Sequence, residues 1–230
     1  MTGRRAGPPQ ARPDPLGGSL AVLGERGAVI HRRVGILLYD NVEALDFAGP
    51  YEVFTTATRM QARLAPGAAA PFSVCTVSRD GGHVRARAGM VVQTDHAFHD
   101  APAIDVLLIP GGVHDTAMKD AVTLQWLAHT AARCEIVASI CTGAFLLAAA
   151  GIADDAPLTT HWEDLADLRT AFPRRSVVDG VRWVEHGPIV SSAGIAAGID
   201  MSLHLVERLA GRALAERTAR QMDVRWLDTP

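Results

Sequence analysis

The sequence contains few cysteines, few aromatic residues and no long apolar run. Cysteine occurs only three times in 230 residues, and aromatic side chains make up 5% of the chain. Three cysteines are too few, and odd in number, for a secreted disulfide framework, so we expect a reducing, cytoplasmic environment. No stretch approaches the roughly 18 apolar residues of a membrane span, and residues 1–10 lack the apolar core of a secretory signal. We therefore expect no contact with a membrane.

Positive charge is concentrated at the beginning of the chain. Residues 1–33 hold six arginines against Asp14 and Glu25, a balance of +4, which leaves −7 for the remainder of a chain with net charge −3. A mildly acidic remainder argues against a surface for nucleic-acid phosphates. The proline- and glycine-rich opening predicts a disordered extension over residues 1–30, with a transit-like or nucleic-acid-touching arm as the alternative. Since 48% of the chain is hydrophobic, residues 31–230 can bury a full core as one domain.

Strands and helices alternate from residue 34 onward. Continuous apolar runs predict buried strands, and the periodic segments between them predict helices. The expected strands cover residues 34–39, 72–77, 106–109, 136–140 and 189–191, and the expected helices cover 48–58, 119–133, 161–171, 196–209 and 213–222. A hairpin is expected from a turn at 79–82 and a strand at 90–93, and a short strand pair around Val177 and 181–184. This order predicts an α/β fold, a three-layer, doubly wound, flavodoxin-like sheet that is mostly parallel.

Cys141 stands where a buried strand pattern changes into a helix. A thiol on such a nucleophile elbow would stand clear of the sheet, and small neighbours such as Ser139 and Gly143 leave room for a substrate. The first N–H groups and the dipole of the following helix should favour the thiolate. The pattern therefore predicts a nucleophile. The alternative is a buried structural cysteine, which is how we interpret Cys75 and Cys134.

Two more features are expected at the edge of the predicted sheet where Cys141 lies. Asp46 follows the first strand, and Gly111 and Gly112 follow the strand at 106–109. An acid beside a thiol can share its proton, while the backbone N–H groups of Gly112 and Thr142 can stabilise negative charge. Plain structural interpretations remain open. Asp46 could only cap a helix, the glycines could only form a tight turn, and Thr142 could be an ordinary first-turn residue.

Five ordered motifs resemble the DJ-1/PfpI superfamily, over about residues 33–225. The motifs are GILLYDNVEALDFAGP at 35–50, IPGG at 109–112, SICTGA at 139–144, TTHW at 159–162 and AGIAAGID at 193–200. Within the superfamily they are most similar to the isonitrile hydratases and to the amidase-like sensor domains of AraC-type regulators. The resemblance implies that Cys141, Thr142 and Asp46 form the catalytic group. It also implies a homodimer and a small-molecule substrate, with Gly111, Gly112 and His161 at the substrate site.

The hydratase resemblance implies a specific reaction. The Cys141 thiolate would attack the terminal isonitrile carbon, Asp46 would protonate that carbon, and water would hydrolyse the thioimidate to an N-substituted formamide. A thiol and a carboxyl group this close should titrate as a coupled pair. We expect no metal and no organic cofactor, because the nine histidines lack metal-ligand spacing.

Several departures from the family pattern bear on the choice of activity. Thr142 stands where the protease-like branch has histidine, and Asp46 stands where the DJ-1 branch has glutamate, so protease, chaperone and deglycase activities fit less well. The His161–Glu163 segment resembles the amidotransferase His-x-Glu but comes only 20 residues after Cys141. His161 could therefore act in catalysis or only shape the pocket, and His114 and Asp115 remain unassigned.

The second class of function is a non-catalytic ligand- or redox-sensing domain. AraC-type regulators carry helix-turn-helix units after this domain, whereas four residues follow Trp226 here. We therefore expect no direct DNA binding and favour a free-standing enzyme. Another hydrolase or glyoxalase-like activity of the superfamily is the remaining alternative.

Overall fold

The computed structural model describes residues 30–230. The extension expected over residues 1–30 thus lies outside the described residues, apart from Ile30. One seven-stranded sheet has the order β5-β2-β1-β6-β7-β9-β8, and every neighbouring pair is parallel except β8 and β9. Its strands are β1 (Arg32–Leu37), β2 (Phe72–Ser78), β5 (His96–Ala97), β6 (Val106–Ile109), β7 (Ile136–Ile140), β8 (Trp183–His186) and β9 (Ile189–Ser192). The hairpin of β3 (His83–Arg85) and β4 (Val91–Gln93) forms a separate small sheet.

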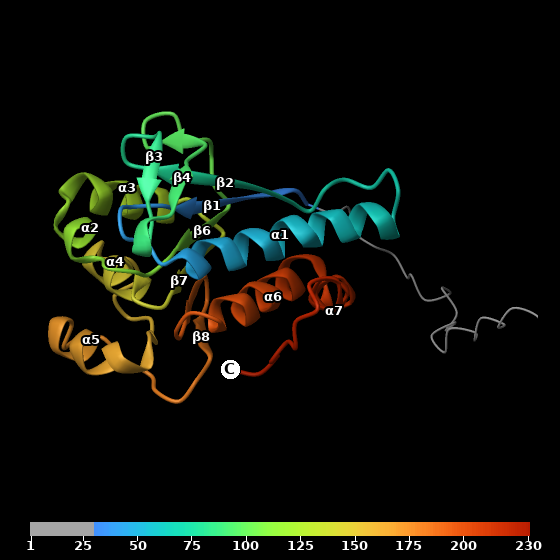
Figure 1. Cartoon of the computed structure of the whole chain (residues 1–230). Helices are drawn as coiled ribbons and strands as arrows, with labels where there is room; N and C mark the ends of the chain where they lie inside the picture. The colour runs from blue at the N-terminus through green and yellow to red at the C-terminus, as the bar shows by residue number, and fades with distance from the viewer. Residues whose placement is uncertain (1–29) are drawn as a thin grey trace, which may run out of the picture.

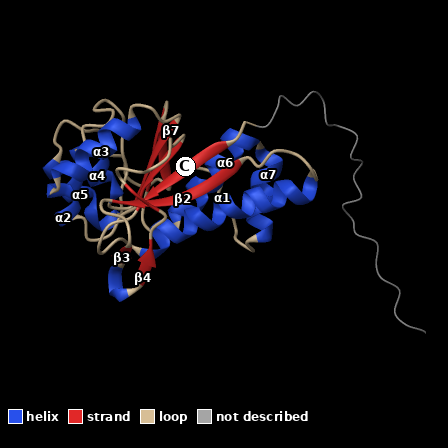
Figure 2. Cartoon of the chain, turned by 90° about the horizontal axis from the view of Figure 1, so that it is seen from above, coloured by secondary structure: helices blue, strands red, loops and turns tan. Residues whose placement is uncertain are grey.

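Helices cover both faces of the large sheet (Figures 1 and 2). One face carries α1 (Ala44–Leu64), α6 (Ala197–Ala210) and α7 (Arg212–Gln221); the other carries α2 (Asp115–Lys119), α3 (Ala121–Ala131), α4 (Gly143–Ala149) and α5 (Leu165–Ala171). Strand side chains alternate between the two cores, so that Ile36 packs with the first helix group and Leu37 with the second. The predicted three-layer, doubly wound architecture is confirmed.

Strand register brings three carboxyl ends to one edge of the sheet. Ile36 of β1 pairs with Leu108 of β6, and Ile109 pairs with Ser139 of β7. The loops that follow β1, β6 and β7 therefore leave the sheet side by side. This edge is where a doubly wound sheet places its ligands.

The first helix is longer than predicted. Residues 48–58 were expected, but α1 runs from Ala44 to Leu64, so Asp46 lies in its first turn and Pro50 lies in its interior. An aspartate and a proline usually mark a helix boundary in solvent. Here the Asp46 side chain is fully buried and accepts a hydrogen bond from Gly111 N–H, which holds the first turn in place.

Three other boundaries differ from the prediction. The helix expected at 119–133 is α3 and begins later, at Ala121, because Asp120 is extended and its carboxylate caps α3 by accepting from Val122 and Thr123 N–H. Lys119 instead ends α2, a separate short helix that was not predicted. The hairpin turn lies between β3 and β4, so the turn at 79–82 only precedes it. The strand pair around Val177 is wrong, because Val177 bridges to Leu158 while β8 pairs with β9.

The α4 helix ends just before Gly151. Gly151 has φ 67°, a left-handed conformation that glycine adopts readily. Its N–H donates to Ala148 O, and Ile152 N–H donates to Leu147 O. These two bonds satisfy carbonyls that the end of the helix would otherwise leave unpaired.

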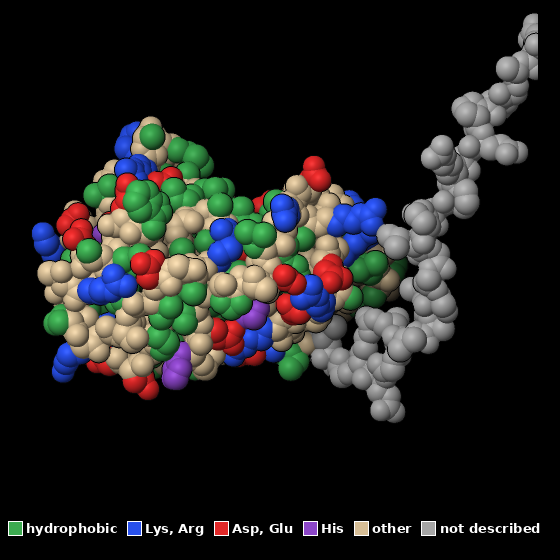
Figure 3. All heavy atoms as spheres, turned by 90° about the horizontal axis from the view of Figure 1, so that it is seen from below, with side chains coloured by type: hydrophobic (Ala, Val, Ile, Leu, Met, Phe, Trp, Pro, Cys, Tyr) green, Lys and Arg blue, Asp and Glu red, His purple; other side chains and the backbone are tan. Residues whose placement is uncertain are grey.

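Charge on the surface is mixed. One face of the molecule shows acidic and basic side chains interspersed (Figure 3). At the start of α7, Arg212 pairs with Glu207, Glu216 and Asp228. Between residues 30 and 230, no helix combines the length and apolar character that crossing a bilayer requires.

We expect Gly143→Ala to lower the free energy of unfolding by about 3 kcal/mol or more. A Cβ at this position would overlap the carbonyl oxygen of Ile109, a backbone atom that cannot turn aside. Gly151→Ala is the matched control, since no atom lies within 4 Å of the added Cβ and only the left-handed backbone opposes it, at about 1–2 kcal/mol. Urea unfolding of both variants checks the prediction, and equal losses would contradict it.

Candidate active site

Cys141 forms the elbow between β7 and α4. Its φ of 53° lies in the left-handed region, which is costly for a residue with a Cβ. Two hydrogen bonds hold the elbow, from Cys141 N–H to Ser192 O at 3.1 Å and from Thr160 Oγ1 to Cys141 O at 2.8 Å. The strained backbone is thus fixed from β9 on one side and from the loop before α5 on the other. The nucleophile-elbow geometry predicted from the sequence is present.

Asp46 is buried beneath this elbow. Its Oδ2 accepts a hydrogen bond from Gly111 N–H at 2.9 Å, and its Oδ1 has no hydrogen-bond partner within the described part of the chain. The helix-cap interpretation is wrong, since Glu43 is the N-cap of α1 and the Asp46 side chain reaches the loop after β6. A Cβ at Gly111 would lie 2.6 Å from Thr142 N and 2.9 Å from Asp46 Oδ2. Only glycine fits there without displacing the carboxyl group.

Thr142 locks the loop after β6 to the start of α4. Gly112 N–H donates to Thr142 Oγ1 at 2.9 Å, and this hydroxyl donates to Gly112 O at 2.9 Å. The expectation that Gly112 N–H is a free donor for negative charge is therefore wrong, because the hydroxyl already accepts from it. The N–H groups directed at the Cys141 sulfur come from Thr142 and Ile195. Ile195 lies in the quoted motif at 193–200, yet a backbone donor gives no side-chain signal in a sequence.

Burial dominates the titration of both groups. It raises the pKa of Asp46 to about 7, aided by the charge of Glu43, while Gly111 N–H and the Cys141 thiol lower that pKa. It also raises the pKa of Cys141 to about 12, aided by the charge of Asp46. The Thr142 N–H at the start of α4 lowers the pKa of the thiol, as predicted, but burial and the charge of Asp46 outweigh it. Near neutral pH Asp46 is the nearby group that can take the proton when a thiolate forms.

A cavity of about 280 Å³ opens onto Cys141. Gly112, Thr142 and His161 also line it, so the structure brings the predicted site residues together, with Asp46 and Gly111 just beneath. The ring of His161 lies with Nδ1 3.4 Å from Asp164 Oδ2.

Other lining residues were missed or left unassigned by the sequence reasoning. They include Glu43, Arg87, Asp164, His114 and Asp115. Arg87 and Glu43 form an ion pair with a 3.3 Å separation. These residues come from the starts of α1 and α2, the hairpin and the segment before α5, so only the fold gathers them.

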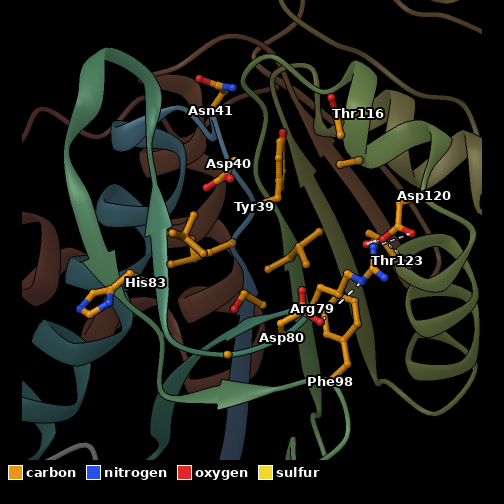
Figure 4. A pocket seen from close by; sticks show the side chains of 16 residues that line it. Tyr39, Asp40, Asn41, Arg79, Asp80, His83, Phe98, Thr116, Asp120 and Thr123 are labelled. Atoms are coloured by element: carbon orange, nitrogen blue, oxygen red, sulfur yellow. Dashed lines mark hydrogen bonds and ion pairs between the residues drawn. The ribbon is translucent and has the colours of Figure 1, made fainter.

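A larger cavity of about 470 Å³ lies at the carboxyl ends of β1 and β2 (Figure 4). It does not include Cys141, and its charged residues are largely paired, as Arg79 is with Asp120 at 3.2 Å. Tyr39 lines the larger cavity and is also influenced by the charges of the Cys141 site. Its ring lines the larger one and its hydroxyl donates to Pro110 O, while burial, together with the charges of Asp46 and Cys141, raises the pKa of that hydroxyl well above its usual value.

The other two cysteines occupy structural positions. Cys75 is a residue of β2 whose side chain packs in the core, and Cys134 Sγ donates to Ile104 O and Thr130 O, each at 3.3 Å. Burial raises the pKa of each thiol to about 11. Over residues 30–230, no three His, Cys, Asp or Glu side chains are grouped so as to hold a metal ion. The expected absence of a cofactor stays a prediction.

Comparison with known proteins gives consistent matches. The DJ-1/PfpI family model matches residues 32–208. Isonitrile hydratase of Pseudomonas putida is 32% identical over 83% of this chain and 78% of its own length. The HTH-type transcriptional regulator GbdR of Pseudomonas aeruginosa is 31% identical over 79% of this chain, which spans about half (48%) of the regulator. A THiJ/PfpI family protein from Pseudomonas syringae superposes with a TM-score of 0.75 at 25% identity, over 94% of this chain and 82% of that one.

Asp46→Asn should make Cys141 a more acidic thiol. Above about pH 7 the wild-type Asp46 is ionised and its charge disfavours the thiolate, whereas asparagine carries none. We expect iodoacetamide to modify Cys141 roughly three- to tenfold faster in the variant at pH 8.5, a change of about 0.5 to 1 pKa unit. Below about pH 6 the two proteins should react alike, because Asp46 is then protonated. Peptide mass spectrometry measures the rates, and slower labelling of the variant at pH 8.5 would contradict this electrostatic coupling.

Proposed function

The chain belongs to the DJ-1/PfpI family, and within it we propose a cysteine-dependent enzyme that adds water to an isonitrile to give an N-substituted formamide. The observation that carries the proposal is the buried pair of Asp46 and Cys141, which opens onto a cavity and shares one proton above about pH 7. Similarity to the Pseudomonas putida isonitrile hydratase over most of the chain supports the same activity.

The first half of the reaction uses the shared proton. Transfer of the thiol proton to Asp46 leaves a thiolate, which bonds to the terminal isonitrile carbon. The carbon then carries the developing negative charge, and Asp46 donates its proton there to give a thioimidate. An acid with a pKa of about 7 is matched to this task near neutral pH.

The arrangement around Gly112 favours this chemistry over acyl transfer. Attack on a carbonyl places negative charge on oxygen, which requires free N–H donors. Gly112 N–H is already bonded to the Thr142 hydroxyl. Attack on an isonitrile places the charge on carbon, where a proton donor is needed instead, and the Asp46 carboxyl group that interacts with the Cys141 thiol can supply that proton.

A ligand- or redox-sensing domain is the second candidate. It is favoured by the 31% identity to a transcriptional regulator over 79% of the chain. Burial also keeps the Cys141 thiol protonated unless Asp46 accepts its proton, which is a poor starting point for catalysis if that transfer does not occur. A sensor of this kind would bind its ligand in the same cavity without consuming it.

We also propose a cytoplasmic homodimer. Leu45 and Tyr51 on α1 and Met90 and Val91 at the hairpin are at least 40% exposed, which suits an apolar contact between two copies. The hairpin is joined to the start of α1 through Arg87 N–H and Val42 O, so these side chains belong to one region. All three cysteines are free, which suits a reducing compartment.

Alkyl and aryl isonitriles should be converted to N-substituted formamides by the purified chain. In ¹⁸O-labelled water the formamide oxygen should carry the label, since water supplies it. Cys141→Ala should abolish the reaction, and Asp46→Asn should lower turnover by about two to four orders of magnitude. Cys134→Ser is the matched control and should keep the rate, because Cys134 does not line the cavity and its sulfur hydrogen-bonds to backbone carbonyls. Binding without turnover would favour the sensor, and turnover of dicarbonyls or amides alone would favour another activity of the family.

The pH dependence should follow the Asp46–Cys141 pair. Below about pH 7 both groups hold protons and no thiolate is available, whereas above it the pair holds the single proton that the reaction needs. We expect kcat/KM to rise as pH increases toward about 7 and then to level off. A fall in kcat/KM as the pH rises through 7 would mean that the fully protonated pair is the active form.

A further inference from the structure

Carboxylates outnumber cationic side chains around the cavity that opens onto Cys141. Four carboxylates line it, and among its described lining residues Arg87 alone is a lysine or an arginine. Arg87 forms its ion pair with Glu43, one of the four. Within residues 30–230 the other three have no lysine or arginine partner; they are Asp115, Glu163 and Asp164. The described lining therefore carries a net negative charge.

The ring of His161 does not supply the missing positive charge. Its Nδ1 lies 3.4 Å from Asp164 Oδ2 and accepts a hydrogen bond from the backbone N–H of Glu163, also at 3.4 Å. An imidazole nitrogen that accepts a hydrogen bond holds no proton, so the ring is neutral in this arrangement. Nδ1 and Asp164 Oδ2 are thus two acceptors side by side, with no donor from the ring between them.

Asp164 is the most sheltered of the three unpaired carboxylates. Its side chain is 32% exposed, against 65% for Glu163, and Asp115 is exposed as well. It does not cap α5, and it accepts no hydrogen bond from a donor in the described part of the chain. Its charge also reaches the reacting sulfur, since it raises the pKa of the Cys141 thiol. A half-buried carboxylate without a donor is stabilised by a ligand that brings positive charge.

We propose that this cavity selects a cationic substrate, an isonitrile that carries an ammonium group, and that Asp164 is the main partner of that group. The inference rests on the proposed isonitrile hydration. The isonitrile carbon bonds to the Cys141 sulfur, so the substituent on nitrogen extends into the cavity. Asp115 and Glu163 attract the cation from solvent, because a cleft lined by charge of one sign concentrates ions of the opposite sign. An isonitrile that carries a carboxylate is repelled.

A bound cation also helps the first step of the reaction. Burial and the charges of Asp46 and Asp164 all raise the pKa of the Cys141 thiol and so disfavour the thiolate. An ammonium group beside Asp164 offsets one of these charges and attracts the thiolate directly. The substrate thus brings part of the positive charge that the site lacks, and we expect the preference in kcat as well as in KM.

Three isonitriles of matched shape provide the first test. Each has a three-carbon chain, which ends in a protonated dimethylamino group, in an uncharged isopropyl group or in a carboxylate. We expect kcat/KM to be about tenfold higher for the cation than for the uncharged compound, and lower still for the anion. Asp164→Asn should lower the cationic-to-uncharged ratio to about threefold or less. Asp80→Asn, 86% exposed and outside this cavity, is the matched control and should keep the wild-type ratio.

Charged thiol reagents test the cavity without an isonitrile. Cationic aminoethyl methanethiosulfonate and anionic sulfonatoethyl methanethiosulfonate each form a disulfide with the Cys141 thiolate and release methanesulfinate. Relative to their rates with mercaptoethanol, the cation should modify Cys141 about tenfold faster than the anion at low ionic strength, and added salt should shrink this ratio. The ratio should fall in Asp164→Asn and, independently, in the double variant Asp115→Asn with Glu163→Gln. Peptide mass spectrometry separates Cys141 from the other two cysteines.

The outcomes are distinct. Equal rates for the cation and the anion, faster reaction of the anion, or the same loss in Asp80→Asn as in Asp164→Asn would overturn the selection of cations while leaving isonitrile hydration in place. A wild-type protein that consumes none of the three isonitriles would overturn the proposed function, and the thiol reagents would then still decide the charge preference of the cavity.

Discussion

The desolvation of Asp46 is the constraint on which the site depends. This carboxyl group is fully buried, one oxygen is bonded to Gly111 N–H and the other has no partner in residues 30–230. Burial disfavours the charged form of Asp46 and raises its pKa to about 7. Once Asp46 has lost its proton, its charge raises the pKa of the Cys141 thiol. The glycines after β6, the Thr142 hydroxyl and the close packing of Gly143 on β6 all serve to keep the carboxyl group and the sulfur together.

The architecture could be predicted from the sequence because its signals are local. Apolar runs defined the strands, and alternation with helices defined the doubly wound order. The boundaries that differed, at α1, at Asp120 and at Val177, depend on contacts between distant segments. Asp46, for example, reads as a loop residue until Gly111 is known to bind it.

The candidate site, like the fold, could be predicted only in part from the sequence. Cys141, Asp46, Thr142 and His161 could be chosen from the chain because their side chains carry the chemistry. The protonation state of Asp46 and Cys141 could not be predicted from the sequence, since the pKa of Cys141 depends on how deeply the elbow is buried and on the charge of Asp46. Nor could the use of Gly112 N–H by Thr142, or the approach of Ile195 and Asp164, which follow from loops that meet only in the folded protein.

The left-handed backbone conformation of Cys141 has a consequence for the stability of the fold. At φ 53° a glycine would adopt the conformation freely, whereas the Cβ of cysteine opposes it by about 1–2 kcal/mol. The strained backbone at Cys141 thus lowers the stability of the fold, and the same conformation places the thiol at the candidate site.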